Sequence, residues 1–465
     1  MPTTSHYCSL SELTRTSRSP DFAVCFDDDH IKTWQELTHD TQFLIGFLEQ
    51  NHYQKIALCT QDSYLFTCMF LASVITQKHI VLPGNVQPAA LDELSEQFDC
   101  LMVDDSVATI PNEKISIFNI SALLETKEFA NPIESFPLNQ ELSLDLVKLT
   151  LFTSGSSGAP KAIQKTLVHI ENEINELEAT WGKLLDNSKV QSTVSHQHIY
   201  GLLFRVLWPL CAGRAFARHN LDYPEQIMTH ATKETTLVSS PALLKRMTTE
   251  YSPKHIRCVF SSGGPLSFDS AQQSNQLLGS LPIEVYGSTE TGGIAFRQQW
   301  DISTPWQLFD CIEAALNSEK CLKLISPYID KFNWYQTADE CEMVSDSQFM
   351  LKGRTDRIIK IEEKRVSLVE VEKRLEQLPW IDECVVIPFE EPERLILASV
   401  IVLSNEGRSK FDTMSKGKFW LLLRSELRNW LEPIAIPRRY RILDEIPLNS
   451  QGKRLISEIE QHIKQ

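Results

Sequence analysis

The stretch Leu151-Phe-Thr-Ser-Gly-Ser-Ser-Gly-Ala-Pro-Lys-Ala-Ile-Gln-Lys-Thr166 carries the clearest signal in this chain. It begins with apolar residues typical of a buried strand and continues with glycines, hydroxyl side chains and a lysine. Gly155 and Gly158 allow the backbone to turn sharply and to bring N–H groups close to an anion. The hydroxyl groups and Lys161 add further donors and a positive charge. We therefore expect a phosphate-binding loop that follows a strand.

The spacing of this loop differs from the Walker A pattern. In Walker A, four residues separate a glycine from Gly-Lys-[Ser/Thr], whereas here the order is Gly-x-x-Gly-x-Pro-Lys. A P-loop kinase or GTPase is therefore disfavoured. A flexible Ser/Gly linker is the plainer alternative, but linkers seldom follow an apolar run such as Leu149-Thr-Leu-Phe152 and end in Pro-Lys.

Four further segments point to the same chemistry and follow the loop in order. They are Tyr286-Gly-Ser-Thr-Glu-Thr-Gly292, Tyr335-Gln-Thr-Ala-Asp339, Gly353-Arg-Thr-Asp-Arg-Ile-Ile-Lys360 and Pro447-Leu-Asn-Ser-Gln-Gly-Lys453. With the loop, they resemble the signature segments of the adenylate-forming superfamily of acyl-CoA synthetases, aryl-acid ligases, luciferases and nonribosomal adenylation domains. The resemblance covers the chain from about residue 150 to its end, and it is strongest to stand-alone acyl- or aryl-acid ligases.

The resemblance implies a set of nucleotide-binding residues. The loop would hold the β- and γ-phosphates of ATP, and Asp339, supported by Arg354, would accept hydrogen bonds from the ribose hydroxyls. The backbone at Gly263-Gly264-Pro265 would lie against the adenine. The complete implied set is Thr153, Ser154, Gly155, Ser156, Ser157, Gly158, Lys161, Gly263, Gly264, Pro265, Tyr286, Gly287, Asp339 and Arg354.

The resemblance also implies catalytic residues and a metal ion. Thr289 would donate to the α-phosphate, Glu290 would bind Mg²⁺, and Lys453 would bridge the reacting carboxylate and the α-phosphate or a ribose oxygen. Asp356 matches the hinge before a mobile C-terminal domain. Taken one at a time, such residues are ordinary turn residues, acidic residues in the first turn of a helix or surface lysines. Because all of them occur in the order that the family has, a site that uses ATP and Mg²⁺ is favoured.

The segment Ser195-His-Gln-His-Ile-Tyr-Gly201 is similar to the part of the family that lines the acyl pocket. We expect His198 and Gly201 to contact the substrate, with His198 a packed gate rather than a base. Amino-acid-specific relatives place an aspartate in this region, but no acidic residue occurs between Val194 and Arg205. The substrate is therefore expected to be a small aryl or fatty carboxylic acid.

The sequence gives less information about the thiol acceptor than about the nucleotide site. Glu363 stands where thioester-forming relatives have a glycine that faces the pantetheine tunnel. A carboxylate there would repel CoA, with its extra phosphates, more than a carrier-bound phosphopantetheine arm. Lys364, Arg365, Arg438, Arg439 and Arg441 could form a basic patch for an acidic acyl carrier protein, although scattered solvated charges are the plainer reading.

The composition of the chain argues against several classes of protein. The net charge of −16 argues against sequence-independent nucleic-acid binding, which depends on basic surface. The eleven cysteines form no Cys-x-x-Cys pair, so we expect reduced thiols and no zinc site. The N-terminus lacks signal-peptide features, and no apolar run reaches the roughly 20 residues of a membrane span. A cytoplasmic protein without a membrane span is expected.

Alternating strand and helix patterns predict an α/β fold with parallel strands. Strands are expected at residues 55–59, 79–82, 100–103, 190–194, 214–217, 236–239, 258–261 and 283–286, with helices at 64–76 and 91–98. Beyond Asp356 the pattern predicts a small α+β unit. The expected organisation is a large N-terminal domain of α/β sheets layered with helices (1–355) that binds ATP and carboxylate, plus a small mobile C-terminal lid (356–465).

These features predict ATP-dependent activation of an aryl or fatty carboxylate to an acyl-adenylate, followed by transfer to a phosphopantetheine thiol. An acyl carrier protein is the favoured acceptor. Two alternatives remain: an acyl-CoA synthetase that uses free CoA, and a non-catalytic nucleotide-binding scaffold. The sequence does not determine the acid, the choice between carrier protein and CoA, or the oligomeric state.

Overall fold

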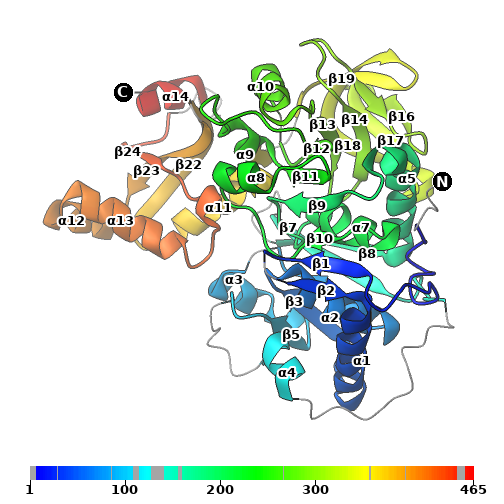
Figure 1. Cartoon of the computed structure of the whole chain (residues 1–465). Helices are drawn as coiled ribbons and strands as arrows, with labels where there is room; N and C mark the ends of the chain where they lie inside the picture. Colours follow the sequence, from blue (N-terminus) through cyan, green and yellow to red (C-terminus); the bar gives the residue numbers. More distant parts are fainter. Residues whose placement is uncertain are drawn as a thin grey trace.

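The computed structural model describes residues 7–28, 30–84, 86–107, 115–126, 141–154, 160–264, 266–354, 358–392, 394–447 and 456–464. The predicted fold class is confirmed: a large α/β N-terminal part is followed by a smaller α+β C-terminal part, drawn in orange and red in Figure 1. The predicted boundary at residues 355/356 lies outside the described residues and stays a prediction.

The first sheet has the strand order β6-β5-β3-β4-β7-β8. Its first five members pair in parallel, while β8 runs antiparallel to β7. The strands are β3 (Lys55–Cys59), β4 (His79–Leu82), β5 (Cys100–Val103), β6 (Ser116–Asn119), β7 (Lys148–Ser154) and β8 (Pro160–Thr166). The predicted strands at 55–59, 79–82 and 100–103 are confirmed, because their buried apolar runs form the centre of this sheet.

The second sheet has thirteen strands in the order β16-β17-β18-β19-β15-β14-β13-β12-β11-β9-β10-β1-β2. The block from β13 to β10 is parallel, and β14 begins an antiparallel arm that the sequence patterns did not predict. The strands are β1 (Ala23–Phe26), β2 (Ile31–Thr33), β9 (Lys189–Ser192), β10 (Phe216–Ala217), β11 (Thr235–Ser239), β12 (Cys258–Ser261), β13 (Ile283–Ser288), β14 (Gly292–Arg297), β15 (Trp306–Leu308), β16 (Glu313–Leu316), β17 (Cys321–Ser326), β18 (Asp330–Ser345) and β19 (Gln348–Arg354).

Helices cover both sheets (Figure 1). They are α1 (Trp34–Gln50), α2 (Ser63–Ile75), α3 (Pro88–Glu93), α4 (Ile120–Thr126), α5 (Leu167–Leu185), α6 (Ile199–Gly201), α7 (Trp208–Ala212), α8 (Pro224–His230), α9 (Pro241–Lys245) and α10 (Phe268–Leu278). The helix predicted over 91–98 is wrong in its bounds: Pro88 starts α3 earlier, and a separate 3₁₀ turn covers Ser95–Gln97. A π-helical turn, Leu202–Leu207, joins α6 to α7. Among the described helices, none is long and apolar enough to cross a membrane.

The C-terminal part has an apolar core of its own. Val371, Leu397 and Phe419 are fully buried in it. Its elements are the hairpin β20 (Ile358–Ile361) and β21 (Lys364–Ser367), helix α11 (Leu368–Glu376), the sheet of β22 (Ile381–Glu391), β23 (Arg394–Leu403) and β24 (Arg439–Ile442), and helices α12 (Asn405–Thr413), α13 (Lys416–Leu427) and α14 (Ile456–Lys464). A separate core is what an independently moving domain needs.

Candidate active site

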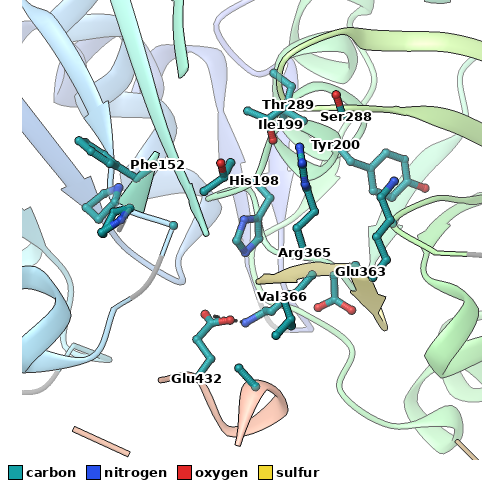
Figure 2. A pocket seen from close by; sticks show the side chains of 18 of the residues that line it. Phe152, His198, Ile199, Tyr200, Ser288, Thr289, Glu363, Arg365, Val366 and Glu432 are labelled. Atoms are coloured by element: carbon teal, nitrogen blue, oxygen red, sulfur yellow. Dashed lines mark ion pairs between the residues drawn. The ribbon is translucent and has the colours of Figure 1, made fainter. Parts of the chain in front are cut away.

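A cavity lies where the C-terminal part meets the two N-terminal sheets. Its walls come from the end of β7, the segment 198–204, the ends of β12 and β13, and the hairpin β20–β21 (Figure 2). In Figure 2 His198, Thr289 and Arg365 come from three of these elements and surround one space. Parallel strands place their carboxyl ends at one edge of a sheet, where ligands of α/β proteins bind.

The predicted phosphate loop joins two paired strands. Thr153 at the end of β7 is the register partner of Lys161 in β8, and Gly155, Ser156, Ser157 and Gly158 lie outside the described residues. Thr153 lines the cavity, and its buried Oγ1 has no hydrogen-bond partner among the described residues. A buried hydroxyl without a partner is costly, so Thr153 is suited to donate to a ligand. Ser154 ends β7, and only its backbone is described.

The segment from Tyr286 to Thr289 crosses from β13 into a tight turn. Tyr286 packs its ring against Trp306, whereas Gly287 and Thr289 line the cavity. A Cβ on Gly287 would lie 2.2 Å from the carbonyl oxygen of Gly292 in β14, so only glycine fits this position. The close approach of the two strands therefore presents Thr289 at the cavity wall.

Glu290 is held by two cations from different parts of the chain. Lys161 Nζ lies 3.1 Å from Glu290 Oε1, and Arg365 from β21 forms an ion pair with Glu290 Oε2. Burial alone would raise the pKa of Glu290, but Arg365 and Lys161 lower it below its ordinary value. The carboxylate is therefore ionised at neutral pH and already engaged by the C-terminal part.

One carboxylate beside nucleotide phosphates is the donor set that Mg²⁺ commonly uses, because this ion keeps waters and takes phosphate oxygens as its other ligands. Within the described part of the chain, no group of three or more His, Cys, Asp or Glu side chains could hold a metal alone. Glu290 thus fits Mg²⁺ delivered with a nucleotide better than a permanently bound ion.

The predicted ribose and adenine residues lie on β18, on β19 and after β12, and Gly263 among them lines the cavity. Asp339 in β18 is buried and is the register partner of Arg354 in β19, but it does not line the cavity. Gly263, with φ +95°, and Gly264 face the turn of the β20–β21 hairpin: a Cβ on Gly263 would lie 2.3 Å from the Cα of Glu363. Pro265 lies outside the described residues.

His198 lines the cavity, as Figure 2 shows. Burial lowers the pKa of His198 to about 4, and nearby Lys364 acts in the same direction. The ring is therefore neutral at physiological pH, which suits a packing role. Gly201 does not line the cavity; a Cβ there would lie 2.1 Å from the carbonyl oxygen of Ser195, so this glycine shapes the segment that carries His198.

Glu363 and its neighbours form the C-terminal wall of the cavity. Burial raises the pKa of Glu363, with Lys364 opposing this effect. Lys364 is paired with Glu432 at 2.8 Å (Figure 2), and Lys360 Nζ donates to the carbonyl oxygen of Gly287. The predicted adenylation lysine, Lys453, and the predicted hinge, Asp356, lie outside the described residues.

Sequence reasoning missed two buried charged residues near the cavity. Lys165 donates to the carbonyl oxygens of Tyr328 and Glu290, at 2.9 and 3.2 Å. Glu173 lines the cavity from α5. A signal for Glu173 was present, because it falls on the apolar stripe that Ile170, Ile174 and Leu177 define at helical spacing.

Comparison with known proteins identifies relatives over most of the chain. The family described as "AMP-binding enzyme" matches residues 14–319. The chain is 24% identical to a D-alanine–D-alanyl carrier protein ligase from Staphylococcus haemolyticus over 93% of this chain and 94% of that protein. It is 26% identical to a 4-coumarate–CoA ligase from Halorhodospira halophila over 66% of this chain and 74% of that protein.

Solved structures show the same fold. The o-succinylbenzoate CoA synthetase of Bacillus subtilis superposes with a TM-score of 0.81 at 17% identity, covering 98% of both chains. At this identity the likeness concerns the fold alone, and it extends over the N-terminal and C-terminal parts together.

Proposed function

Because this chain belongs to the family of AMP-binding enzymes, we propose that it is an AMP-forming acid–thiol ligase that activates an aryl or fatty carboxylate with ATP. The acyl group then passes to a phosphopantetheine thiol. The observation that carries the proposal is the convergence of Thr153, Thr289 and His198 on one cavity beside the Lys161–Glu290 pair. Segments that are far apart in sequence are adjacent there, and to them we assign phosphate binding, catalysis and acyl binding.

The chemistry follows from what a carboxylate needs in order to react. A carboxylate oxygen attacks the α-phosphorus of ATP, the bond to the bridging oxygen breaks, and pyrophosphate leaves. The barrier comes from repulsion between anions, so catalysis requires positioning and positive charge. We assign phosphate binding to Lys161 and the loop hydroxyls, and donation to the α-phosphate to Thr289. When bound at Glu290, Mg²⁺ would supply further neutralisation of the phosphates.

Three assignments rest on the family resemblance. Lys453 is proposed to bridge the carboxylate and the α-phosphate, with Asp356 as the hinge of a mobile C-terminal domain. Asp339 with Arg354 is proposed to hold the ribose. Asp339 and Arg354 are register partners on adjacent strands, which supports the last assignment, because a carboxylate can accept hydrogen bonds from both ribose hydroxyls.

The position of the C-terminal part supports a role in thiol transfer rather than adenylation. Arg365 forms an ion pair with the Glu290 carboxylate, and the turn at Glu363 lies against Gly263. Adenylation would need Glu290 for a metal ion, so we propose that Arg365 withdraws when ATP and Mg²⁺ bind and returns for transfer. This arrangement would leave Glu363 beside the path of the incoming thiol arm.

A carrier protein is the proposed acceptor. Lys364 and Arg365, which the sequence suggested as members of a basic patch, are instead paired with Glu432 and Glu290. Other basic residues gather elsewhere on this part: the side chains around two adjoining surface hollows include Arg424, Arg428, Arg438, Arg439 and Arg441. Arg428, Arg438 and Arg439 are exposed, and Arg439 is paired with Glu391 at 3.0 Å. This surface suits an acidic carrier protein, whereas the partly buried Glu363 carboxyl at the cavity wall disfavours the phosphate-rich CoA.

The test is a comparison of acceptors. With one activated acid, we expect a holo-acyl carrier protein to be acylated with higher kcat/KM than free CoA. Arg438→Glu should lower kcat/KM for the carrier protein and leave kcat/KM for CoA unchanged. Glu363→Gly should raise kcat/KM for CoA, so that the difference between the two acceptors becomes smaller. Arg408→Glu, an exposed arginine paired with Asp444 outside the basic surface, is the matched control. Preferential acylation of CoA by the unmodified enzyme would reverse the assignment in favour of an acyl-CoA synthetase.

A further inference from the structure

One acidic side chain of the cavity wall lies on α5, far in sequence from the charged residues of the C-terminal wall. Glu173, on α5, is 3% exposed. It lines the cavity together with Leu203, Phe204, Val285 and Gly293, none of which carries a charge. A carboxyl group is seldom buried in such surroundings unless it has partners, because removing it from water is costly.

The two oxygens of Glu173 have different surroundings. Oε1 accepts a hydrogen bond from the backbone N–H of Gly293 at 2.7 Å. Oε2 is buried and accepts no hydrogen bond from any described residue. A buried carboxylate oxygen without a donor is a large energetic cost, so a ligand that brings a donor would be favoured there.

The neighbouring glycines make room for this carboxyl group. A Cβ on Gly292, whose φ is +67°, would lie 2.6 Å from Glu173 Oε2, and a Cβ on Gly293 would lie 3.3 Å from Oε1. Both glycines line the cavity. The strand β14 therefore has no side chain at the point where it passes the carboxyl group, and Glu173 forms that part of the wall.

A buried lysine determines what kind of donor suits Glu173. Lys165 is 4% exposed, and it counteracts the effect of burial, which raises the pKa of Glu173. A second cation, such as the ammonium group of an amino acid, would be repelled by Lys165. A neutral hydroxyl or aromatic amine avoids that repulsion and still donates to Oε2.

The remaining walls favour a flat apolar group. Tyr200 and Phe204 line the cavity with their rings 4.8 Å apart, and Leu203 and Val285 add aliphatic surface. Aromatic side chains contact another ring well in edge or offset packing. An aromatic acid with one hydrogen-bond donor therefore matches both the walls and the spare oxygen.

We propose that Glu173 is the specificity-determining residue of the acyl site and accepts a hydrogen bond from a hydroxyl or amino group on the ring of an aromatic acid. The proposal rests on the proposed function, because it names the acid that the ligase activates. It gives Glu173 a role that an apolar residue at the same place could not fill.

The experiment measures ATP–pyrophosphate exchange with matched acids. Benzoic and cinnamic acids are compared without a substituent and with a hydroxyl or an amino group at each ring position. We expect the wild-type enzyme to prefer a hydroxylated or aminated acid over its unsubstituted parent by about 10- to 100-fold in kcat/KM, as for a hydrogen bond to a charged group. The hydroxyl and amino series separate the two donor types.

Two variants assign this preference to one side chain. Glu173→Gln should lower kcat/KM for the preferred acid about 10- to 100-fold through KM, and leave the unsubstituted acid within about threefold of wild type. Glu176→Gln is the same chemical change on the same helix, at a residue that does not line the cavity, and should have no effect. If Glu173 had a purely structural role, Glu173→Gln would lower kcat/KM equally for all acids.

The wild-type enzyme alone can overturn the proposal. It does so if no hydroxylated or aminated aromatic acid has a higher kcat/KM than its unsubstituted parent, or if fatty or amino acids have the highest kcat/KM. These results would leave the proposed ligase function intact, since exchange would still depend on an acid. Absence of exchange with every acid would instead contradict the proposed function on which the inference depends. Failure of Glu173→Gln to fold would not remove the test, because the wild-type comparison decides it.

Discussion

Removing Arg365 should separate the two halves of the proposed reaction. Arg365 reaches from the C-terminal hairpin to Glu290, and the two side chains are only 13% and 8% exposed. In Arg365→Leu the carboxylate keeps Lys161 at 3.1 Å, so no buried charge is left without a partner. The cost therefore falls on the docked position of the C-terminal part rather than on folding.

The size of the effect follows from the bond that is lost. A hydrogen bond to a charged partner contributes about 1.5–3 kcal/mol when it is shielded from water. Since about 1.4 kcal/mol corresponds to a factor of ten, the docked arrangement should become about 10- to 100-fold less populated. If this arrangement transfers the acyl group, the transfer rate falls by that factor, while adenylation stays within about threefold of wild type.

Two assays read the two steps. Acid-dependent ATP–pyrophosphate exchange reports adenylation, and single-turnover acylation of the acceptor by supplied acyl-adenylate reports transfer. Lys352→Met is the control, since it removes an exposed ion pair with Glu342 (2.7 Å) within the N-terminal part; exposed pairs contribute little. Unchanged transfer in Arg365→Leu, or an equal loss in both assays, would refute the assignment of this arrangement to thiol transfer.

Two further substitutions test the charged groups of the site. Glu290→Gln keeps the shape of the side chain but removes the anionic oxygen that Mg²⁺ prefers. The adenylation rate should fall on the order of 10-fold or more, and the Mg²⁺ concentration needed for half-maximal activity should rise. An unchanged Mg²⁺ titration would show that Glu290 is not a metal ligand. Glu370 lines the cavity, and burial raises its pKa to about 7, with Glu93 acting in the same direction and Arg374 opposing. A raised pKa means that folding favours the protonated form, so stability falls as pH rises from about 4.5 to about 7. Glu370→Gln should therefore be more stable than wild type at pH 8, by up to about 3.5 kcal/mol at about 1.4 kcal/mol per pKa unit, and no more stable at pH 4. An equal difference in melting temperature between variant and wild type at both pH values would contradict this.

The sequence predicted the family and the centre of the fold for physical reasons that can be named. Buried parallel strands such as β3 (Lys55–Cys59) are short apolar runs between turn residues, and this pattern is local. The five segments beginning with the loop at Thr153 resemble one superfamily, and the family match over residues 14–319 confirms that resemblance. Local patterns and segment order were enough for both conclusions.

Contacts between distant segments could not be predicted in this way. The antiparallel arm from β14 to β19 includes long, largely exposed strands such as β18 (Asp330–Ser345), whose mixed polarity gives no clear alternation. The pairing of Arg365 with Glu290 depends on where the C-terminal part docks, which no local pattern encodes. The apolar stripe of α5 indicates that Glu173 is buried, but only the fold shows the neighbouring glycines that make room for its carboxyl group.

The most direct measurement is ATP–pyrophosphate exchange by the wild-type enzyme and by Lys453→Ala across a panel of aryl and fatty acids. We expect at least one acid to support exchange, and we expect Lys453→Ala to abolish that exchange while largely retaining transfer from a supplied acyl-adenylate, a loss confined to one transition state. Lys464→Ala, in the last helix, is the matched control and should behave as wild type. Nucleotide binding without exchange for any acid would instead identify a non-catalytic scaffold, and equal loss of both steps in Lys453→Ala would contradict a C-terminal domain that moves between them.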